Sequence, residues 1–304
     1  MNLFKPQLFK SRLLNSFISL STLTFPVILS AFALTTPVAT WAADPFRTNN
    51  PKRIGVETRK AFELMFRDGN YPAASKQIDK ALRSEADDPL VQGMKASFAY
   101  LDQDYQGMQL YAQKTQAAAQ KLMTTDPLRG NIYMGVGYLI EAGYIVKTDG
   151  IVSGAPKALG LVQKLFDSIK AAQAIAPNDP ELNLIKGYMD MLIATVLPLA
   201  DLENALASLR VASPDYLKWR GIAIGYRDAK NTDKALEAIN KAIKAAPQNP
   251  ELAYLKGQIL WMRNDLEGAK KQYRQAIAKR NQLPQDLVKQ INSECTGLSG
   301  ASCI

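Results

Sequence analysis

The sequence predicts an all-α fold built as a stack of helical hairpins. The main observation is one pattern written twice between Tyr216 and Asn281, with a constant period of 34 residues. The residue pairs separated by this period are Ala223 and Gly257, Ala235 and Ala269, and Ala242 and Ala276. A fixed period of this length is typical of a solenoid in which each repeat is one pair of helices. Such stacks commonly act as binding surfaces.

The first 42 residues have the features of an export signal. Their three charged residues are all basic, and an apolar stretch runs from residue 13 to about residue 34. The small residues Thr40 and Ala42 suit signal peptidase, so we expect a signal peptide over residues 1–42 that is cleaved after Ala42. The mature protein is then expected in the periplasm or a comparable envelope lumen. The alternative is an uncleaved N-terminal anchor, because the apolar stretch is long for a signal.

The charge of the mature chain is smaller than that of the whole chain. Removing three of the 37 basic residues and none of the 28 acidic ones leaves 34 − 28 = +6, instead of +9. This balance is compatible with an acidic partner or with peripheral contact to a membrane surface. It does not indicate nucleic-acid binding, because the lysines are spread along helices and no basic patch contains interleaved aromatic residues. The sequence leaves the oligomeric state open.

Six hairpins can be counted outward from the doubled pattern. After an extended leader over residues 43–54, a solenoid is expected over residues 55–283, followed by a capping helix and tail over residues 284–304. The hairpins are expected to begin near Gly55, Pro89, Gly130, Pro180, Tyr216 and Pro250. Proline suits the first turn of a helix, where its missing N–H is not needed. Alanine or glycine recurs where the two helices of a hairpin must approach closely.

This pattern resembles the tetratricopeptide repeat family. The residues that match its signature are Trp219, Ile222, Ala223, Tyr226, Ala235, Ile239, Ala242 and Pro247. The resemblance is strong over residues 216–283, and an exported bacterial protein of this family fits the signal. It implies a right-handed α–α superhelix whose first helices line a concave groove, and it implies protein or peptide binding. The family motif is structural and brings no catalytic residue with it.

Two segments depart from the period. From Gly130 to Pro180 the spacing exceeds one repeat by sixteen residues, and we expect a long apolar helix from residue 128 to about residue 147, then an enlarged loop over residues 148–156. Ile151 and Val152 either fold back onto the core or mark a functional insertion. The helix over residues 188–197 is apolar on nearly every face. Its methionines, Met189 and Met191, either fill the core or line an adaptable surface.

The family geometry predicts which side chains face the groove. The candidates are Arg59, Tyr100, Tyr138, Glu141, Tyr188, Arg220, Arg227, Tyr254 and Trp261. Tyrosine, tryptophan and arginine are favoured at interface hot spots. Arg220 and Arg227 suit charge-assisted contact with an acidic segment. Taken singly, each residue has an ordinary alternative role in packing between repeats or as a solvated charge.

The leading interpretation is a non-enzymatic adaptor that holds a protein or peptide in the groove. The alternative is a carrier of an apolar small molecule or lipid between the central apolar helices. An enzyme using the carboxylates of Glu141 and Asp190 is disfavoured, because nothing in the spacing brings them together. The chain has no histidine, the commonest metal ligand, so no metal or cofactor is expected. Cys295 and Cys303 either form a local disulfide or remain two thiols.

Overall fold

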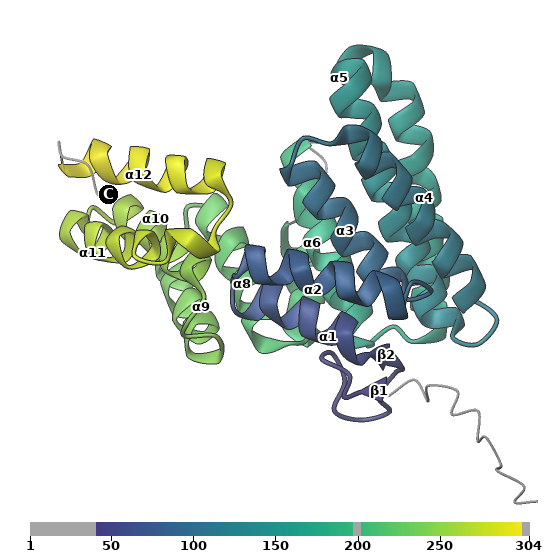
Figure 1. Cartoon of the computed structure of the whole chain (residues 1–304). Helices are drawn as coiled ribbons and strands as arrows, with labels where there is room; N and C mark the ends of the chain where they lie inside the picture. Colours follow the sequence, from purple (N-terminus) through teal and green to yellow (C-terminus); the bar gives the residue numbers. More distant parts are fainter. Residues whose placement is uncertain (1–40, 197–201, 300–304) are drawn as a thin grey trace, which may run out of the picture. The chain divides into compact units, whose positions relative to one another are not determined.

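The computed structural model describes residues 41–196 and 202–299, within a compact unit that spans residues 39–304 (Figure 1). The elements in chain order are β1 (Trp41–Ala42), β2 (Ile54–Gly55), α1 (Val56–Phe62), the π-helical η1 (Glu63–Arg67), α2 (Tyr71–Ser84), α3 (Pro89–Leu101), α4 (Tyr105–Leu122), α5 (Pro127–Ile175), α6 (Pro180–Val196), α7 (Leu202–Val211), α8 (Asp215–Asp228), α9 (Thr232–Ala245), α10 (Pro250–Met262), α11 (Leu266–Ile277), the 3₁₀ turn η2 (Arg280–Gln282) and α12 (Gln285–Ser299). None of the helices in these ranges is long and apolar enough to cross a membrane.

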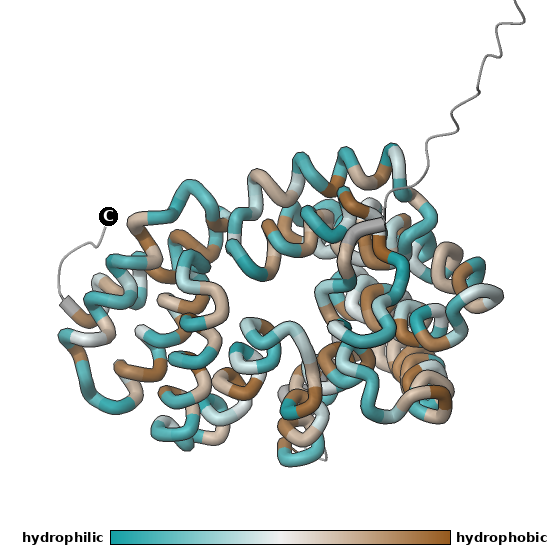
Figure 2. Tube along the Cα trace, turned by 90° about the horizontal axis from the view of Figure 1, so that it is seen from below, coloured by the Kyte–Doolittle hydropathy of each residue, from teal (hydrophilic) through white to brown (hydrophobic). Residues whose placement is uncertain are grey.

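The helices form six antiparallel hairpins followed by a final helix. α1 and η1 pair with α2, α3 with α4, the first half of α5 with the second, α6 with α7, α8 with α9, and α10 with α11. Figure 2 shows apolar and polar residues alternating along these helices, as expected where one face packs on a neighbour. The predicted fold class is confirmed: an all-α superhelix of hairpins capped by α12.

Side-chain caps set the start of most helices. Asp88, Asp126 and Asn249 each precede a proline, and each accepts a hydrogen bond from a backbone N–H in the first turn that follows. Asn70 and Asp104 cap the second helices of their hairpins in the same way. A capping oxygen satisfies an N–H that has no partner inside the helix. The hairpin starts counted from the period therefore lie within three residues of the observed helix starts.

Small residues allow the two helices of a hairpin to touch. A Cβ added at Gly257 would lie 2.5 Å from the ring of Tyr273, and one added at Gly187 would lie 2.6 Å from Leu209. Ala223, in the place on α8 that corresponds to Gly257, has no exposed surface. The large partner side chain fills the space that the small one leaves, which gives close packing without voids.

The prediction of an enlarged loop over residues 148–156 is wrong. The chain is helical on both sides of Gly150, which turns it with a φ of 77°. This positive φ is readily available only to glycine, so one residue replaces the loop. The sixteen extra residues lengthen both halves of α5, whose turn lies beyond the ends of α3 and α4 in Figure 1. Val152 does not fold back onto the core, since 90% of its surface is exposed; the side chain of Ile151 lies outside the described set.

Most of the apolar helix α6 packs into the hydrophobic core. Met189 and Met191 are buried in the main hydrophobic cluster, and Asp190 is held by an ion pair with Lys186 one turn earlier. Leu192 is half exposed. The side chains of residues 193–196, and residues 197–201 entirely, lie outside the described part of the chain. The same holds for Cys303, so its pairing with the buried Cys295 stays a prediction.

The first hairpin also packs against the sixth. Tyr71 Oη at the start of α2 donates a hydrogen bond to Glu251 Oε1 of α10 over 3.0 Å. Asn249 Nδ2 donates to the carbonyl oxygen of Phe66 over 3.1 Å, and Gly69 lies directly against Asn249 and Pro250. The superhelix therefore brings its two ends together (Figures 1 and 2).

Candidate partner-binding surface

The first helices of the last hairpins share one continuous face. Arg227 Nη1 on α8 donates to Gln258 Oε1 on α10 over 2.7 Å, so these two faces lie side by side. Tyr254, Gln258 and Trp261 follow each other at intervals of four and three residues, which puts them on one side of α10. We call this surface the α8–α10 face; its members are Arg220, Ile224, Arg227, Tyr254, Gln258 and Trp261.

The α8–α10 face continues onto the capping helix. Tyr254 Oη donates to Glu294 Oε1 of α12 over 2.6 Å, and Tyr273 Oη donates to the other oxygen of that carboxylate over 3.1 Å. Gln258 Nε2 donates to Tyr254 Oη over 2.7 Å. These bonds fix the orientation of Tyr254, and burial raises the pKa of its hydroxyl above its ordinary value. Tyr254 is thus a rigid, neutral donor.

Arg220 has an internal partner. Its two Nη atoms lie 3.1 and 3.3 Å from the carboxylate oxygens of Glu251, and this carboxylate also accepts the hydroxyl of Tyr71. Burial alone would lower the pKa of Arg220, but Glu251 together with the hydroxyls of Tyr188 and Tyr71 outweighs this effect, and the pKa is raised. Tyr188 Oη donates to the carbonyl of Leu217 over 2.8 Å, and burial raises its pKa to about 12. The structure places Arg220 and Tyr188 in contacts between repeats.

Two of the predicted aromatic residues expose their rings. Trp261 is 48% exposed and Tyr100 is 43% exposed. The ammonium group of Lys147 lies 5.4 Å from the centroid of the Tyr100 ring. Trp261 is followed by Met262, also 44% exposed, at the turn into α11. The open apolar part of the α8–α10 face is therefore its Trp261 end.

The remaining predicted residues have local partners. Arg59 Nε donates to Glu63 Oε1 over 2.8 Å, one turn along the same helix. Glu141 accepts a hydrogen bond from Gln116 Nε2 over 2.7 Å, and Lys164 lies 5.7 Å from the centroid of the Tyr138 ring. The structure thus brings together Arg220, Arg227, Tyr254 and Trp261 on the α8–α10 face. Tyr100, Tyr138 and Glu141 belong to the second and third hairpins, and Arg59 belongs to the first.

A buried ionic network in the leader was not foreseen from the sequence. Arg47 Nε and Nη2 donate to Asp179 over 2.6 and 2.7 Å, and Nη2 also donates to Glu181 over 2.8 Å. Arg129 Nε and Tyr133 Oη donate to the same Glu181 carboxylate over 3.1 and 2.6 Å. The side chains of Glu181 and Arg129 are 0% and 2% exposed. The network joins the leader to the N-terminal ends of α5 and α6.

The charges in this network compensate one another. Burial alone would raise the pKa of Glu181, but Arg129 and Arg47 overcome this effect and hold it below the ordinary value. The pKa of Asp88 moves the other way, because burial raises it more than Arg129, at 3.6 Å, lowers it. Glu181 is therefore the carboxylate that keeps two buried guanidinium groups paired.

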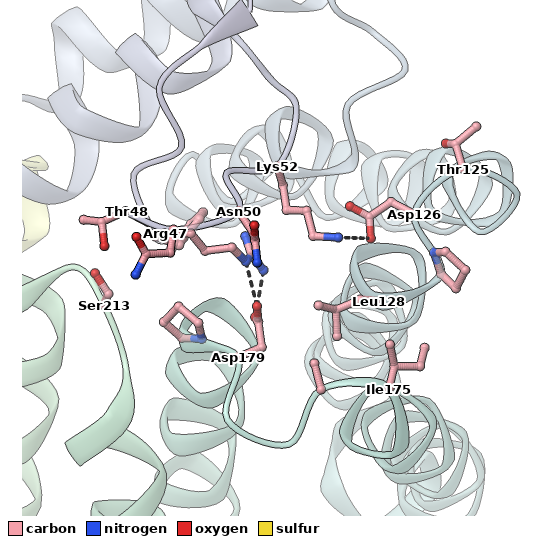
Figure 3. Close-up of a pocket in the computed structure, with 15 residues that line it drawn as sticks. Arg47, Thr48, Asn50, Lys52, Thr125, Asp126, Leu128, Ile175, Asp179 and Ser213 are labelled. Carbon is pink, nitrogen blue, oxygen red and sulfur yellow. Dashed lines mark hydrogen bonds and ion pairs between the residues drawn. The ribbon is translucent and has the colours of Figure 1, made fainter.

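Two cavities flank the leader. One has a volume of about 610 Å³ and is lined by Thr48, Asn50, Lys52, Thr125 and the N-terminal end of α6 (Figure 3). The other, of about 700 Å³, lies on the side of Glu85 and Asp88. Lys52 Nζ, 3.2 Å from Asp126 Oδ1, lines both cavities. Their linings combine charged and polar side chains with apolar surface, and neither cavity includes the apolar residues 132–146 or 188–192.

The carboxylates considered for catalysis have separate partners. Glu141 is bonded to Gln116, and Asp190 is paired with Lys186. Over the residues that the structure describes, no cluster of three aspartate, glutamate, histidine or cysteine side chains is arranged to hold a metal ion.

Comparison with known proteins covers this part of the chain. The model of the tetratricopeptide repeat matches residues 220–284, which include all six residues of the α8–α10 face. Residues 220–284 therefore carry the tetratricopeptide repeat pattern. Repeats of this kind are commonly protein-interaction scaffolds.

Two solved structures match the chain at low sequence identity. A thermophilic tetratricopeptide repeat protein of Thermus thermophilus is 16% identical, with 81% of this chain and 98% of that chain covered and a TM-score of 0.32. A chain of the APC/C hetero-tetramer Cut9–Hcn1 is 15% identical over 77% of this chain, with a TM-score of 0.37, and this chain spans only 55% of its length. No curated protein matches the chain.

Proposed function

We propose that this protein is a non-enzymatic adaptor of the bacterial cell envelope, which holds a segment of a partner protein on the α8–α10 face. The observation that carries the proposal is the half-exposed Trp261, placed beside the oriented polar side chains of Arg227 and Gln258. An aromatic anchor next to arginine is the composition of interface hot spots. The envelope location rests on the signal-like N-terminal sequence, which lies outside the described residues.

The partner segment is proposed to carry a carboxylate. Arg227 is 25% exposed at its side chain, and its bonds to Asp228 and Gln258 hold its guanidinium in place. Arginine and carboxylate form strong charge-assisted pairs. Arg220 is not expected to bind the partner directly, because Glu251 already holds it.

The test compares two matched double variants of the exported protein. Arg227→Ala with Trp261→Ala removes the open part of the face, while Leu110→Ala with Val211→Ala removes side chains of 46% and 50% exposure elsewhere. Bound proteins captured from envelope extract are compared quantitatively between the two variants and the unaltered protein. We expect a partner that is lost from the first variant and retained by the second. Equal capture by both folded variants would show that the partner does not bind at the α8–α10 face.

A carrier of an apolar molecule is the second candidate, and it receives less support. The central residues expected to line its site, such as Ile132, Met134, Met189 and Met191, are buried within the main hydrophobic cluster. Native mass spectrometry of protein purified under gentle conditions tests it. A bound lipid-sized adduct would favour the carrier, and the mass of the bare chain would count against it.

A further inference from the structure

Glu294 on the capping helix α12 is a half-buried carboxylate, and all its hydrogen-bond donors in the described part of the chain are uncharged. Tyr254 Oη and Tyr273 Oη donate to it over 2.6 and 3.1 Å, and Gln290 Nε2 donates over 3.1 Å from one turn earlier on α12. α12 already packs through buried apolar residues, among them Ile291. Burying part of a carboxylate without an opposite charge beside it costs free energy. Attachment of α12 alone therefore does not account for a glutamate at this position.

Gln258 connects Glu294 to Arg227. Gln258 Nε2 lies 2.7 Å from Tyr254 Oη and 3.3 and 3.4 Å from the two carboxylate oxygens of Glu294. Gln258 Oε1 accepts a hydrogen bond from Arg227 Nη1 over 2.7 Å. An amide carries its donor and its acceptor on separate branches, so acceptors on one side and a guanidinium on the other fix which way it points. Glu294 thus helps to orient the amide oxygen that Arg227 contacts.

The guanidinium of Arg227 is held on two sides. Nε and Nη2 both lie 2.8 Å from Asp228 Oδ1, and Nη1 donates to Gln258. These contacts leave one N–H on each Nη atom without a partner among the described residues. N–H groups on the two Nη atoms can bind a carboxylate in a bidentate manner. The contacts with Asp228 and Gln258 therefore determine how a partner's carboxylate would be received.

We propose that Glu294 is a positioning residue of the α8–α10 face. Through Gln258, it holds the Arg227 guanidinium in the orientation that receives the partner's carboxylate. This role rests on the adaptor function proposed above. A side chain that is already fixed loses less conformational freedom when a partner binds, so the affinity is higher. The capping helix then contributes to binding as well as ending the stack.

The first measurement is made on the Arg227 side chain itself. NMR relaxation of its Nε–H group, assigned by the loss of this signal in Arg227→Lys, reports how rigidly the guanidinium is held in the exported protein. Glu294→Gln keeps the size of the side chain but offers one acceptor oxygen instead of two. We expect a lower order parameter for Arg227 in this variant, because Gln258 is held less firmly. Gln258→Met removes the connecting amide and should have the same effect.

Two controls separate positioning from simple attachment of α12. Tyr273→Phe removes a hydrogen bond from the same carboxylate without altering Gln258. Glu267→Gln makes the same chemical change at a glutamate of α11 whose side chain is 82% exposed. Both variants should leave Arg227 as rigid as it is in the unaltered protein. If Tyr273→Phe loosened Arg227 as much as Glu294→Gln, or if neither loosened it, the proposal would be overturned.

The second measurement is the yield of partner protein crosslinked by a photoreactive residue at position 261. We expect Glu294→Gln to lower this yield by about fivefold or more, and Tyr273→Phe and Glu267→Gln to preserve it. An unchanged yield in Glu294→Gln would contradict the positioning role, and a higher yield would show that the charge of Glu294 repels the partner instead. The absence of any crosslink when Glu294 is unaltered would contradict the adaptor function itself, so the two failures are distinguishable.

Discussion

Tyr71 and Glu251 are 180 residues apart in the sequence, and their side chains meet across a hydrogen bond of 3.0 Å. The bond joins the first hairpin of the solenoid to the sixth. Glu251 is held at the same time by Arg220 of the fifth hairpin. The Glu251 carboxylate on α10 thus accepts hydrogen bonds from two other hairpins and links the first, fifth and sixth hairpins.

We expect Tyr71→Phe to lower the free energy of unfolding by about 1.5–3 kcal/mol, because a buried carboxylate loses a hydrogen-bond donor. Urea unfolding of the compact unit measures this effect. Tyr100→Phe serves as the control, since the ring of Tyr100 is 43% exposed and its change should be near zero. Identical shifts for the two variants would mean that the contact between the first and sixth hairpins contributes nothing to stability.

We expect Glu181→Gln to destabilise the fold by about 3–5 kcal/mol, since it removes the charge that pairs with two buried guanidinium groups. Arg47 and Arg129 have side chains that are only 4% and 2% exposed. Thermal and urea unfolding give the measurement. Asp167→Asn alters an exposed carboxylate bonded to Gln163 and serves as the control, with little change expected.

The shifted pKa values of Glu181 and Asp88 predict that the stability of the fold depends on pH. The pKa of Glu181 is lower in the fold than its ordinary value, so its stabilising effect is complete above about pH 4.3 and is lost as the pH falls through its folded pKa. Asp88 acts in the opposite direction, because its raised pKa favours the protonated form in the fold. We therefore expect the stability difference between the unaltered protein and Glu181→Gln to shrink below about pH 4.3. A difference that stays constant down to acid pH would show that Glu181 is not charged in the fold.

Gly69 and Gly160 are expected to respond oppositely to alanine. Gly69 has a φ of 62°, and a Cβ there would lie 2.6 Å from Asn249 Oδ1, so Gly69→Ala should destabilise by about 1–3 kcal/mol. Gly160 is exposed within α5 and a Cβ there would meet no atom within 4 Å, so Gly160→Ala should stabilise by about 0.5–1 kcal/mol. Chemical unfolding distinguishes the two signs. A neutral Gly69→Ala would contradict the close approach of the first and sixth hairpins.

Ala235→Leu is expected to destabilise by about 1–3 kcal/mol through overpacking. Ala235 is fully buried on α9, within one of the two hairpins that show the 34-residue period. A thermal melt is sufficient to detect this change. Ala278→Leu, in the turn after α11, is a suitable comparison because Ala278 is more exposed. An unchanged melt for Ala235→Leu would mean that α9 does not pack through this residue.

The parts of the fold that follow from local rules were predictable. The 34-residue period, the prolines at helix starts and the small residues at hairpin contacts all act within one repeat, so a sequence pattern records them. The loop expected over residues 148–156 failed for a local reason as well. Gly150 alone turns the chain. Pro156 is accommodated within the second half of α5, after this turn.

The parts that join distant residues were not predictable. Arg47 meets Asp179 and Glu181 across more than 130 residues of sequence, and no spacing rule connects a leader to the start of a fourth hairpin. Arg220 was correctly placed on a first helix, but its partner Glu251 and the approach of Tyr71 depend on how the superhelix closes.

The most direct test of the adaptor account is site-specific photo-crosslinking in intact cells. A photoreactive phenylalanine derivative replaces Trp261 in one strain and Leu110 in another, and these two positions have 48% and 46% exposure. The account predicts a crosslinked protein of defined mass from position 261, none from position 110, and loss of the crosslink when Arg227→Ala is added. Crosslinks of equal yield from both positions, or none from position 261 in cells that export the protein, would contradict it.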